Sequence, residues 1–413
     1  EAAPHETVRF TLANLEKKVL ERFVDPAPFV PGDVREREKR CEDILNIQAH
    51  GLAKRLRHVR ASSAVIGLSG GLDSILAARL IMEQGLVVRC LHFVTPFFGK
   101  PQLIPHWEKV YGLEVEAVDV GEAFVRLLRE RPAHGFGKVM NPCVDCKILM
   151  MRKARELMKK WGASFLISGE VLGQRPMSQR RDTLNVIRRD AEVKESLLRP
   201  LSAQLLDPTA PEISGLVDRN KLLGIFGRGR KSQMALADQM GLKEIPTPAG
   251  GCKLAEKENS RRYWPVLTRL KEPTVEDFEL SNIGRQYWFG DHWLSMGRNE
   301  ADNSALERLV RPGDAILRVR DFPSPFALAR QLTPWDNETL QDAASLVASY
   351  SPKGVRAAEA SPDGTIAVRV QINGESTFVN VAPKRTPALP WGEPEFVDVR
   401  KAIKAENRPT FDE

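Results

Sequence analysis

Short apolar runs alternate with longer amphipathic segments from residue 64 to about residue 169. Apolar runs of this length, bounded by polar residues, are typical of strands that are buried on both faces of a parallel sheet. The alternation therefore predicts an α/β fold with a doubly wound parallel sheet, whose ligand lies at the carboxyl ends of the strands. The expected strands are 64–68, 87–94, 115–120 and 164–168, and the expected helices are 74–84, 103–111, 121–130 and 147–161.

The pattern changes on both sides of this region. An amphipathic helix is expected from residue 34 up to the first strand, and two further helices are expected at 212–226 and 231–240. From about residue 282, aromatic residues and short alternating strands such as 316–319 and 366–370 predict a separate α+β module. The expected domains are an N-terminal helical extension (1–60), the α/β domain (61–205), a helical continuation that carries the third cysteine discussed below (206–281) and the C-terminal α+β module (282–413).

The string SGGLDS, from Ser69 to Ser74, joins the first expected strand to the first expected helix. Gly70 and Gly71 let the backbone approach an anion closely, and the unpaired amides at the helix start favour negative charge there. The two serines add hydroxyl donors, and Asp73 offers a carboxylate that can help to hold Mg2+. A lone pair of glycines is more often an ordinary turn, but the whole string favours a site for nucleotide phosphates.

Five cysteines in a chain without the apolar stretch of a secretory signal argue for metal binding or catalysis rather than for disulfides. Cys41 and Cys90 fall in helix and strand patterns, which predicts buried packing positions. The string NPCVDCK places Cys143 and Cys146 in a CxxC just before a helix, where the helix start lowers the pKa of a thiol. Cys252 follows two glycines in PAGGCKLAE.

Three thiolates suit a four-iron four-sulfur cluster with one open iron, or a nucleophilic pair plus a bystander. Half of a structural zinc site is the alternative, but zinc normally requires four ligands, and only one further cysteine stands in a suitable loop.

Charge and hydropathy restrict the partners only in part. The 61 Lys and Arg against 54 Asp and Glu give a formal charge of +7, which favours a polyanionic partner weakly. No apolar run reaches membrane-spanning length, so a cytoplasmic protein without a membrane partner is expected. Three basic clusters downstream of SGGLDS favour RNA: Arg175, Arg180, Arg181, Arg188 and Arg189, then Arg228, Arg230 and Lys231, then Arg261 and Arg262.

SGGLDS resembles the PP-loop of the N-type ATP pyrophosphatase superfamily, which implies that ATP is cut between its α and β phosphates and adenylates a carbonyl oxygen. Together with NPCVDCK, the string GEVLGQRPMSQ at 169–179 and the GGC loop, it resembles tRNA thiouridine synthetases related to 4-thiouridine synthetase and tRNA 2-thiouridylase. The resemblance covers roughly residues 60–265. It implies that Gly169, Gln174 and Ser178 line the pocket for the nucleotide and the target base.

The resemblance implies a tRNA sulfurtransferase that forms AMP and pyrophosphate. Ser69, Gly70, Gly71, Asp73 and Ser74 would bind ATP and Mg2+, and Asp73, Cys143 and Cys252 would be catalytic. Sulfur would come from a persulfide on Cys143 or from sulfide on a cluster held by the three thiols. The expected partners are tRNA and either sulfide or a sulfur-donor protein. Whether the chain forms a homodimer is left undecided by the sequence.

Two other functions remain open. The first is a PP-loop ligase, amidase or sulfurtransferase that acts on a small molecule. The second is a non-enzymatic RNA-binding protein with a structural metal site.

The string MGRNEADNSALERLV, at 296–310, resembles the RNA-binding module of NFACT proteins. It departs from that family at 315–317, where AIL replaces the usual Trp, Phe and His. The resemblance implies that this module holds the RNA. The matching residues are Gly297, Arg298, Asn299, Asn303 and Leu306.

Overall fold

A computed structural model describes residues 33–58, 63–246 and 251–407, and it divides the chain into units 1–61 and 62–413. The first unit contains helix α1 (Val34–His58), and the rest of the expected N-terminal extension lies outside the described residues. The prediction that Cys41 is buried is wrong: its side chain is exposed, because no described residue of this unit packs over the polar surface of α1. In the described ranges, no helix combines the length and apolar character that crossing a membrane requires.

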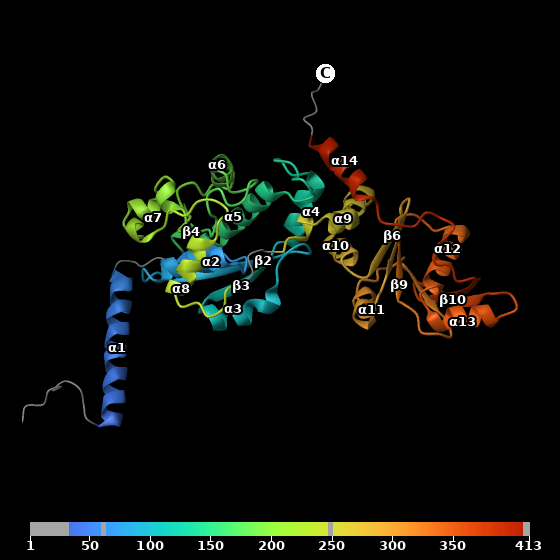
Figure 1. The fold of residues 1–413 in the computed structure, drawn as a ribbon, viewed down its shortest axis with the longest axis horizontal. Coiled ribbons are helices and arrows are strands. Elements are labelled where there is room, and N and C mark those ends of the chain that lie inside the picture. Colours follow the sequence, from blue (N-terminus) through green and yellow to red (C-terminus); the bar gives the residue numbers. More distant parts are fainter. Residues whose placement is uncertain (1–32, 59–62, 247–250, 408–413) are drawn as a thin grey trace, which may run out of the picture. The chain divides into compact units, whose positions relative to one another are not determined.

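The second unit begins with a five-stranded sheet in which all neighbouring strands are parallel (Figure 1). The strand order is β3-β2-β1-β4-β5, so the chain leaves β1 toward one edge and later returns to the other side of β1. This confirms the predicted doubly wound α/β fold and puts the topological switch point at the carboxyl end of β1. The strands are β1 (Ala64–Gly67), β2 (Val88–Val94), β3 (Glu114–Asp119), β4 (Phe165–Ile167) and β5 (Leu197–Leu198).

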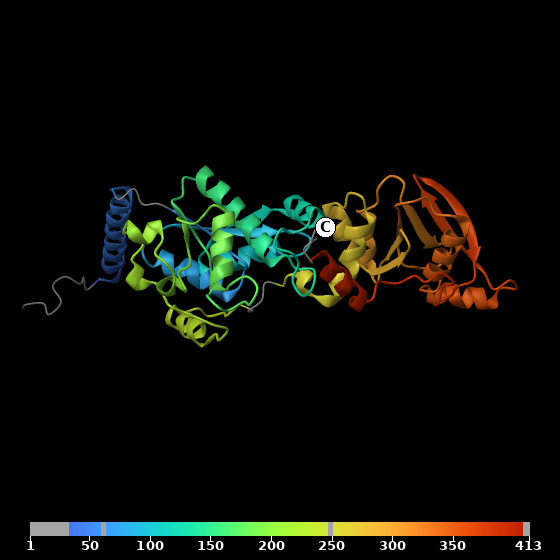
Figure 2. The same ribbon diagram turned by 90° about the horizontal axis from the view of Figure 1, so that it is seen from above.

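Helices cover both faces of this sheet (Figure 2). Ala64 and Ile66 of β1 pack into one core with α2, α3 and α8, whereas Val65 packs into a second core with α5 and α6. Alternate residues of a strand point to opposite faces, so a strand that is apolar at every position is buried on both sides. These helices are α2 (Leu72–Met82), α3 (Ile104–Tyr111), α5 (Cys143–Lys160), α6 (Arg181–Asp190) and α8 (Lys231–Gln239), and α4 (Gly121–Glu130) precedes α5.

The expected helix at 212–226 is wrong. The chain there forms only α7 (Ala210–Ile213) and a 3-10 turn, η3 (Arg219–Lys221), and then runs extended along residues 200–201. Gly215, with φ of 73°, follows the end of α7, because this left-handed conformation does not continue a helix. The remaining short turns and helices are η1 (Pro101–Leu103), η2 (Ala203–Leu205), η4 (Lys253–Ala255), α9 (Lys257–Arg269) and α10 (Val275–Ser281).

The last part of the chain forms the expected α+β module, a six-stranded antiparallel sheet of order β11-β10-β8-β9-β7-β6. One face of the sheet packs its apolar residues against α12 and α13. The strands are β6 (Arg285–Phe289), β7 (His292–Met296), β8 (Ala315–Val319), β9 (Ala327–Gln331), β10 (Ile366–Ile372) and β11 (Glu375–Val381). The helices are α11 (Glu300–Glu307), α12 (Asn337–Ala348), α13 (Pro352–Ala360) and α14 (Phe396–Glu406).

A single core connects this module to the helices that precede it. Phe124 of α4, Tyr263 of α9, Phe278 of α10 and Trp293 of β7 are all fully buried in this core. Cys146 and Cys252 pack against the same core. The thiols therefore lie at its border, next to the α/β domain.

Candidate functional site

The SGGLDS loop follows β1 and ends in helix α2. Gly70 has φ of 74°, and a β-carbon at this position would collide with the indole ring of Trp107. Gly71 is the N-cap residue of α2, and no side chain caps that helix end. The first amides of α2 are therefore left free for an anion, which is the arrangement that helix starts use to bind phosphate.

The serines of the loop support its backbone. The Ser74 hydroxyl donates to the Gly71 carbonyl (2.9 Å), and the Ser69 hydroxyl oxygen accepts from the Gly71 amide (3.3 Å). The two hydroxyl oxygens lie 3.3 Å apart. These hydrogen bonds stabilise the loop and leave the first backbone amides of α2 available to a ligand.

Asp73 and Gln174 meet across the loop. The side-chain amide nitrogen Nε2 of Gln174 donates to Asp73 Oδ2 (3.1 Å). Asp73 Oδ1 and Gln174 Oε1 are both buried and have no hydrogen-bond partner within the described structure. Two orphaned oxygens at a phosphate loop suit a cation or a hydroxyl donor of a ligand, because a buried acceptor without a partner is costly.

Gly169 follows β4 and lies against the same loop. A β-carbon on Gly169 would be 2.5 Å from Cα of Ser74, so only glycine fits this close approach of two backbones. Ser178 is buried. The structure thus brings Gly169 and Gln174, expected from the resemblance, into contact with SGGLDS.

Beside the loop lies a cavity of about 300 Å3 that includes Ser69 and Gly70. Its other walls come mainly from the segment after β2 and from α3, at the carboxyl ends of the strands, where the ligand was expected. The sequence did not predict several of these residues. The position of Lys100 just beyond the end of a strand could have indicated it, because ligands bind there in doubly wound sheets. The wall residues that were not predicted include Lys100, Trp107, Tyr111 and Glu244, the last paired with His106 (3.0 Å).

A buried ion pair stands behind Gly169. Glu170 is 2% exposed and accepts from Arg199 Nε (3.0 Å), and Lys147 Nζ lies 3.7 Å from the other Glu170 oxygen. Burial raises the pKa of Glu170, but the charges of Lys147 and Arg199 outweigh this effect, so the net pKa is lowered. Because Lys147 is the residue after Cys146, this contact ties the CxxC helix to the phosphate loop.

The three cysteines converge at the start of α5. Helix α5 begins at Cys143 itself, four residues earlier than expected, and the Asn141 side chain donates to the Cys143 sulfur (3.0 Å). Cys252 precedes η4, and the next amide, of Lys253, donates to the Phe97 carbonyl (2.9 Å). This bond fixes the GGC segment to the loop that follows β2.

Burial and neighbouring charge raise the pKa of Cys146 and of Cys252. Burial raises the pKa of Cys146, and a charge on Cys252 raises it further. Burial also raises the pKa of Cys252 to about 11, with a contribution from Cys143. The expected lowering of the pKa at the helix start is wrong for Cys146, because its apolar surroundings and the other two thiols outweigh the helix effect.

The type of donor atom, a thiolate sulfur, suits an iron–sulfur cluster. Three thiols within electrostatic reach of one another border an apolar core, and thiolates are the usual ligands of such clusters. As they are arranged among the described residues, however, no group of three or more His, Cys, Asp or Glu side chains could hold a metal ion. Cys90, in contrast, is buried in β2 as expected, and burial raises its pKa to about 12.

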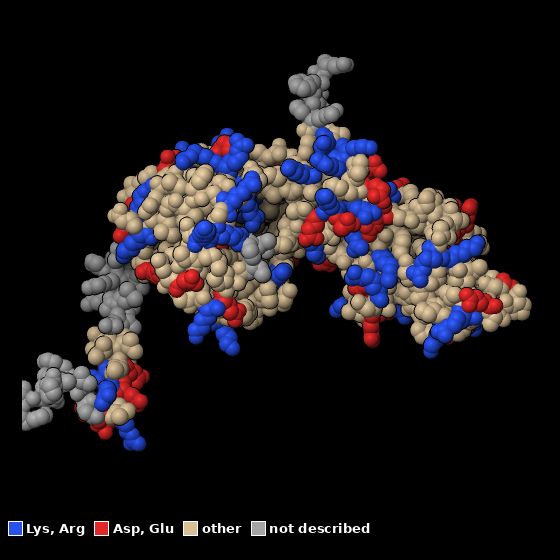
Figure 3. Space-filling view, viewed as in Figure 1, with Lys and Arg blue, Asp and Glu red and all other residues tan. Residues whose placement is uncertain are grey.

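The basic clusters differ in how much of their charge is neutralised. Arg261 and Arg262 pair with Glu258 and Glu393, and Arg188 and Arg189 also pair with acidic residues. Arg175 is exposed beside Gln174. Figure 3 shows Lys and Arg side chains in groups on both the α/β domain and the C-terminal module, with acidic side chains among them.

Residues 60–205 match a family model described as thiamine biosynthesis protein (ThiI). The match covers about a third of the chain and includes SGGLDS, NPCVDCK and GEVLGQ. It does not reach Cys252 or the C-terminal module.

Two types of curated protein are similar to part of this chain. A probable tRNA sulfurtransferase of Thermococcus kodakarensis is 28% identical over 167 residues, which cover 38% of this chain and 40% of that protein. Another, of Methanosarcina acetivorans, is 30% identical over 129 residues, 27% of this chain and 28% of that protein. A glutamine-dependent NAD(+) synthetase of Mycobacterium tuberculosis is 47% identical over 126 residues, 28% of this chain and 18% of that protein.

The chain therefore spans less than half the length of each of these relatives. The similarity to the family model and to the sulfurtransferases is thus limited to part of this chain and to part of each relative.

Proposed function

We propose that this protein is an ATP-dependent tRNA sulfurtransferase that replaces a uridine carbonyl oxygen with sulfur. The observation that carries the proposal is the direct link between the phosphate loop and the thiols. Ser74 touches Gly169, Glu170 follows Gly169, and Glu170 pairs with Lys147 next to Cys146. The parts that activate a carbonyl and the parts that handle sulfur thus belong to one site.

The loop would activate the uridine. Free amides of α2 bind the phosphates of ATP, and the orphaned oxygen of Asp73 helps to hold Mg2+ against the departing pyrophosphate. The carbonyl oxygen attacks the α-phosphorus, and pyrophosphate leaves. AMP then becomes the leaving group on the base, because a bare carbonyl oxygen leaves poorly.

The thiols would supply the sulfur. Cys143, Cys146 and Cys252 would hold a four-iron four-sulfur cluster, which when bound supplies an iron that can carry sulfide. The alternative within the same function is a persulfide on Cys143, with Cys252 as the second thiol. In both cases Asn141 positions the Cys143 sulfur, and the buried walls keep water away from the activated base.

The C-terminal module would hold the RNA. The resemblance of residues 296–310 to the NFACT-type module supports this role, and the exposed Arg175 adds a positive charge beside the loop. As a tRNA-modifying enzyme the protein would act in the cytoplasm, with sulfide or a sulfur-donor protein as its second partner.

The similarity to NAD(+) synthetases favours a second candidate function. In this candidate the same loop adenylates a small acid, and ammonia or sulfide is the nucleophile. Pyrophosphate release that depends on a small acid and not on RNA would identify it.

The first test measures iron, zinc and acid-labile sulfide in protein purified without oxygen, together with tRNA thiolation and pyrophosphate release. We expect about four irons and four sulfides per chain, lost in Cys143→Ala, Cys146→Ala and Cys252→Ala. Those variants should still release pyrophosphate with tRNA, whereas Asp73→Asn should release it about 100-fold more slowly, because the pyrophosphate charge loses its partner.

Cys41→Ala is the matched control, because that thiol is exposed and lies in the other unit. Absence of iron with thiolation still dependent on Cys143 and Cys252 would replace the cluster by the persulfide. Stoichiometric zinc without thiolation would contradict the proposed function.

A further inference from the structure

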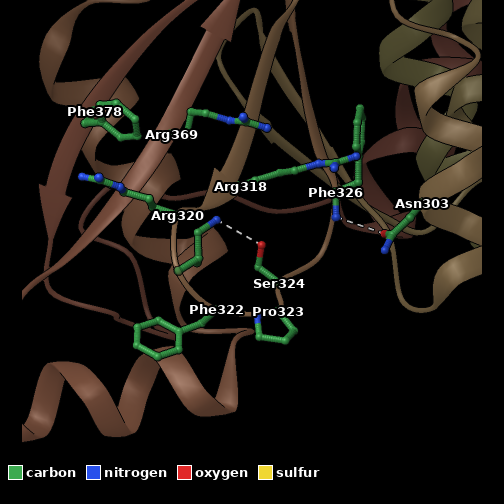
Figure 4. A pocket seen from close by; sticks show the side chains of 10 residues that line it. Asn303, Arg318, Arg320, Phe322, Pro323, Ser324, Phe326, Arg369 and Phe378 are labelled. Atoms are coloured by element: carbon green, nitrogen blue, oxygen red, sulfur yellow. Dashed lines mark hydrogen bonds between the residues drawn. The ribbon is translucent and has the colours of Figure 1, made fainter.

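The outer face of the antiparallel sheet contains a cavity of about 560 Å3. Three arginines and several aromatic rings line it (Figure 4). Arg369 and Arg318 lie between Phe378 on one side and Phe326 on the other, and Arg320 lies beside Phe378. No part of the candidate site on the α/β domain belongs to this cavity.

The strand register explains why these residues meet. Arg318 of β8 is directly opposite Arg369 of β10, and Arg369 is directly opposite Phe378 of β11. Cross-strand partners point to the same face of a sheet, and Arg320 shares that face because it is two residues from Arg318. Three neighbouring strands therefore present one row of two arginines and a phenylalanine, with a third arginine beside it.

This row is unfavourable for folding. Like charges directly opposite each other destabilise a strand pair. Arg318 is 3.4 Å from the exposed Glu307, and Arg320 is 3.6 Å from the exposed Asp321, so each acid screens its partner weakly. Among the described residues, the side chain of Arg369 has no hydrogen-bond or ion-pair partner. An anionic ligand would complete the charge balance of this face.

The aromatic rings indicate which kind of anion. Phe378 is 52% exposed, and the Arg320 guanidinium lies 4.8 Å from its ring centroid. The Arg318 guanidinium lies 4.6 Å from the Phe326 ring centroid. Positive charges beside an exposed aromatic ring match the alternation of phosphate and base along a single nucleic-acid strand.

We propose that this face binds an unpaired stretch of RNA, with Arg318, Arg320 and Arg369 on the phosphates and a base stacked on Phe378. A single strand fits better than a duplex, because the bases of a duplex are stacked on one another and cannot reach a ring. The choice of RNA over other polyanions rests on the proposed function. The location and the binding mode come from the register and the cavity.

The test measures the affinity of the full chain for a fluorescent single-stranded oligouridylate by anisotropy, without ATP, at several salt concentrations. Phe378→Ala should weaken binding about 5- to 100-fold, because stacking of one base contributes about 1–3 kcal/mol. Arg369→Gln should weaken binding and reduce the slope of log affinity against log salt by about 0.7, the value for one phosphate contact.

Arg356→Gln is the matched control, since it removes an equal charge from α13 in the same module, outside the cavity. Thermal melting provides a second readout: Arg369→Gln should melt no lower than the native chain, because it removes a like-charge contact. Equal affinity of Phe378→Ala, Arg369→Gln and the control would overturn the proposal, as would stronger binding of a duplex of the same length.

The two proposals fail in different ways. Loss of thiolation with intact, cavity-dependent RNA binding would contradict only the proposed function. Thiolation with RNA binding that ignores this cavity would contradict only the location proposed here.

Discussion

Both ring nitrogens of His92 are engaged. The Lys100 amide donates to Nε2 (2.7 Å), so Nε2 carries no proton and Nδ1 donates to the Leu68 carbonyl (2.9 Å). The ring thus connects the end of β1 to the segment that follows β2, on the wall of the cavity beside SGGLDS. Burial lowers the pKa of His92, although the Leu68 bond opposes this effect.

This arrangement predicts a specific pH dependence. As the pH falls through about 6.5, the unfolded chain binds a proton at His92 and the folded chain does not, so the free energy of unfolding decreases. We expect a loss of up to about 1.4 kcal/mol between pH 7.5 and 5.5 that is absent in His92→Asn, which keeps the donor to Leu68. Urea denaturation at pH 7.5 and 5.5 measures it, and an equal loss in both proteins would contradict it.

The sequence predicted the chemistry of single residues better than their surroundings. The types and order of the residues in SGGLDS indicated a phosphate loop, and the resemblance placed Gly169 and Gln174 beside it. Trp107 and Glu244 were missed because each reaches the loop only through the tertiary fold. The pKa of Cys146 was predicted in the wrong direction for the same reason, since burial is not visible in a helix pattern.

One carboxylate caps the start of helix α10 and also pairs with arginines of the C-terminal module. Thr274 and Asp277 form a capping box at its start. Asp277 is 1% exposed and also pairs with Arg330 Nη1 (2.6 Å) and Arg311 Nη1 (2.9 Å) of the C-terminal module. A single carboxylate thus serves the helix start and the contact with the antiparallel sheet.

Removal of this carboxylate should be costly. We expect Asp277→Ala to lower the free energy of unfolding by about 2–4 kcal/mol, because it breaks the capping box and leaves the buried Arg330 with Asp314 as its remaining carboxylate partner. The exposed neighbour Glu276 forms a partly exposed ion pair with Arg311 Nη2 (3.4 Å). Glu276→Ala should therefore lower the free energy of unfolding by less than about 1 kcal/mol. Urea denaturation of the two variants compares them, and similar losses would show that burial of the pair is unimportant.

The sequence predicted β1 to β4 of the parallel sheet and the helices α2 to α5, because period and burial agree there. It did not predict the two-residue edge strand β5 or helix α6. It predicted wrongly at 212–226, where apolar residues at helical spacing instead contact residues 200–201 through backbone hydrogen bonds. Spacing alone cannot separate an apolar helix face from an irregular segment that packs at the same intervals.

On the scale of the whole molecule, the expected boundary near residue 282 runs through a common core. Phe278 precedes the boundary and Trp293 follows it, and both are fully buried in that core. The change in pattern at 282 marks a change of sheet type. It carries no information about packing between the parts, because that packing depends on residues far apart in the chain.

The common core predicts cooperative unfolding of residues 62–413. The slowest-exchanging amides of β1 and β7 should report opening free energies within about 1 kcal/mol of each other, since the common core joins the two sheets. Hydrogen exchange followed by mass spectrometry measures both values. Exchange of β7 through an opening several kcal/mol easier than that of β1 would show two independent units.

The strand orders of the two sheets also set the sequence of events during folding. β10 and β11 pair through the short turn at Asn373 and Gly374, so this hairpin forms from neighbouring residues within microseconds. β1 must wait for β4, about a hundred residues later in the chain, before its second edge is covered. On the ribosome, SGGLDS therefore emerges long before the strand that completes its sheet, and the apolar edge of β1 is the part of the nascent chain that most needs protection.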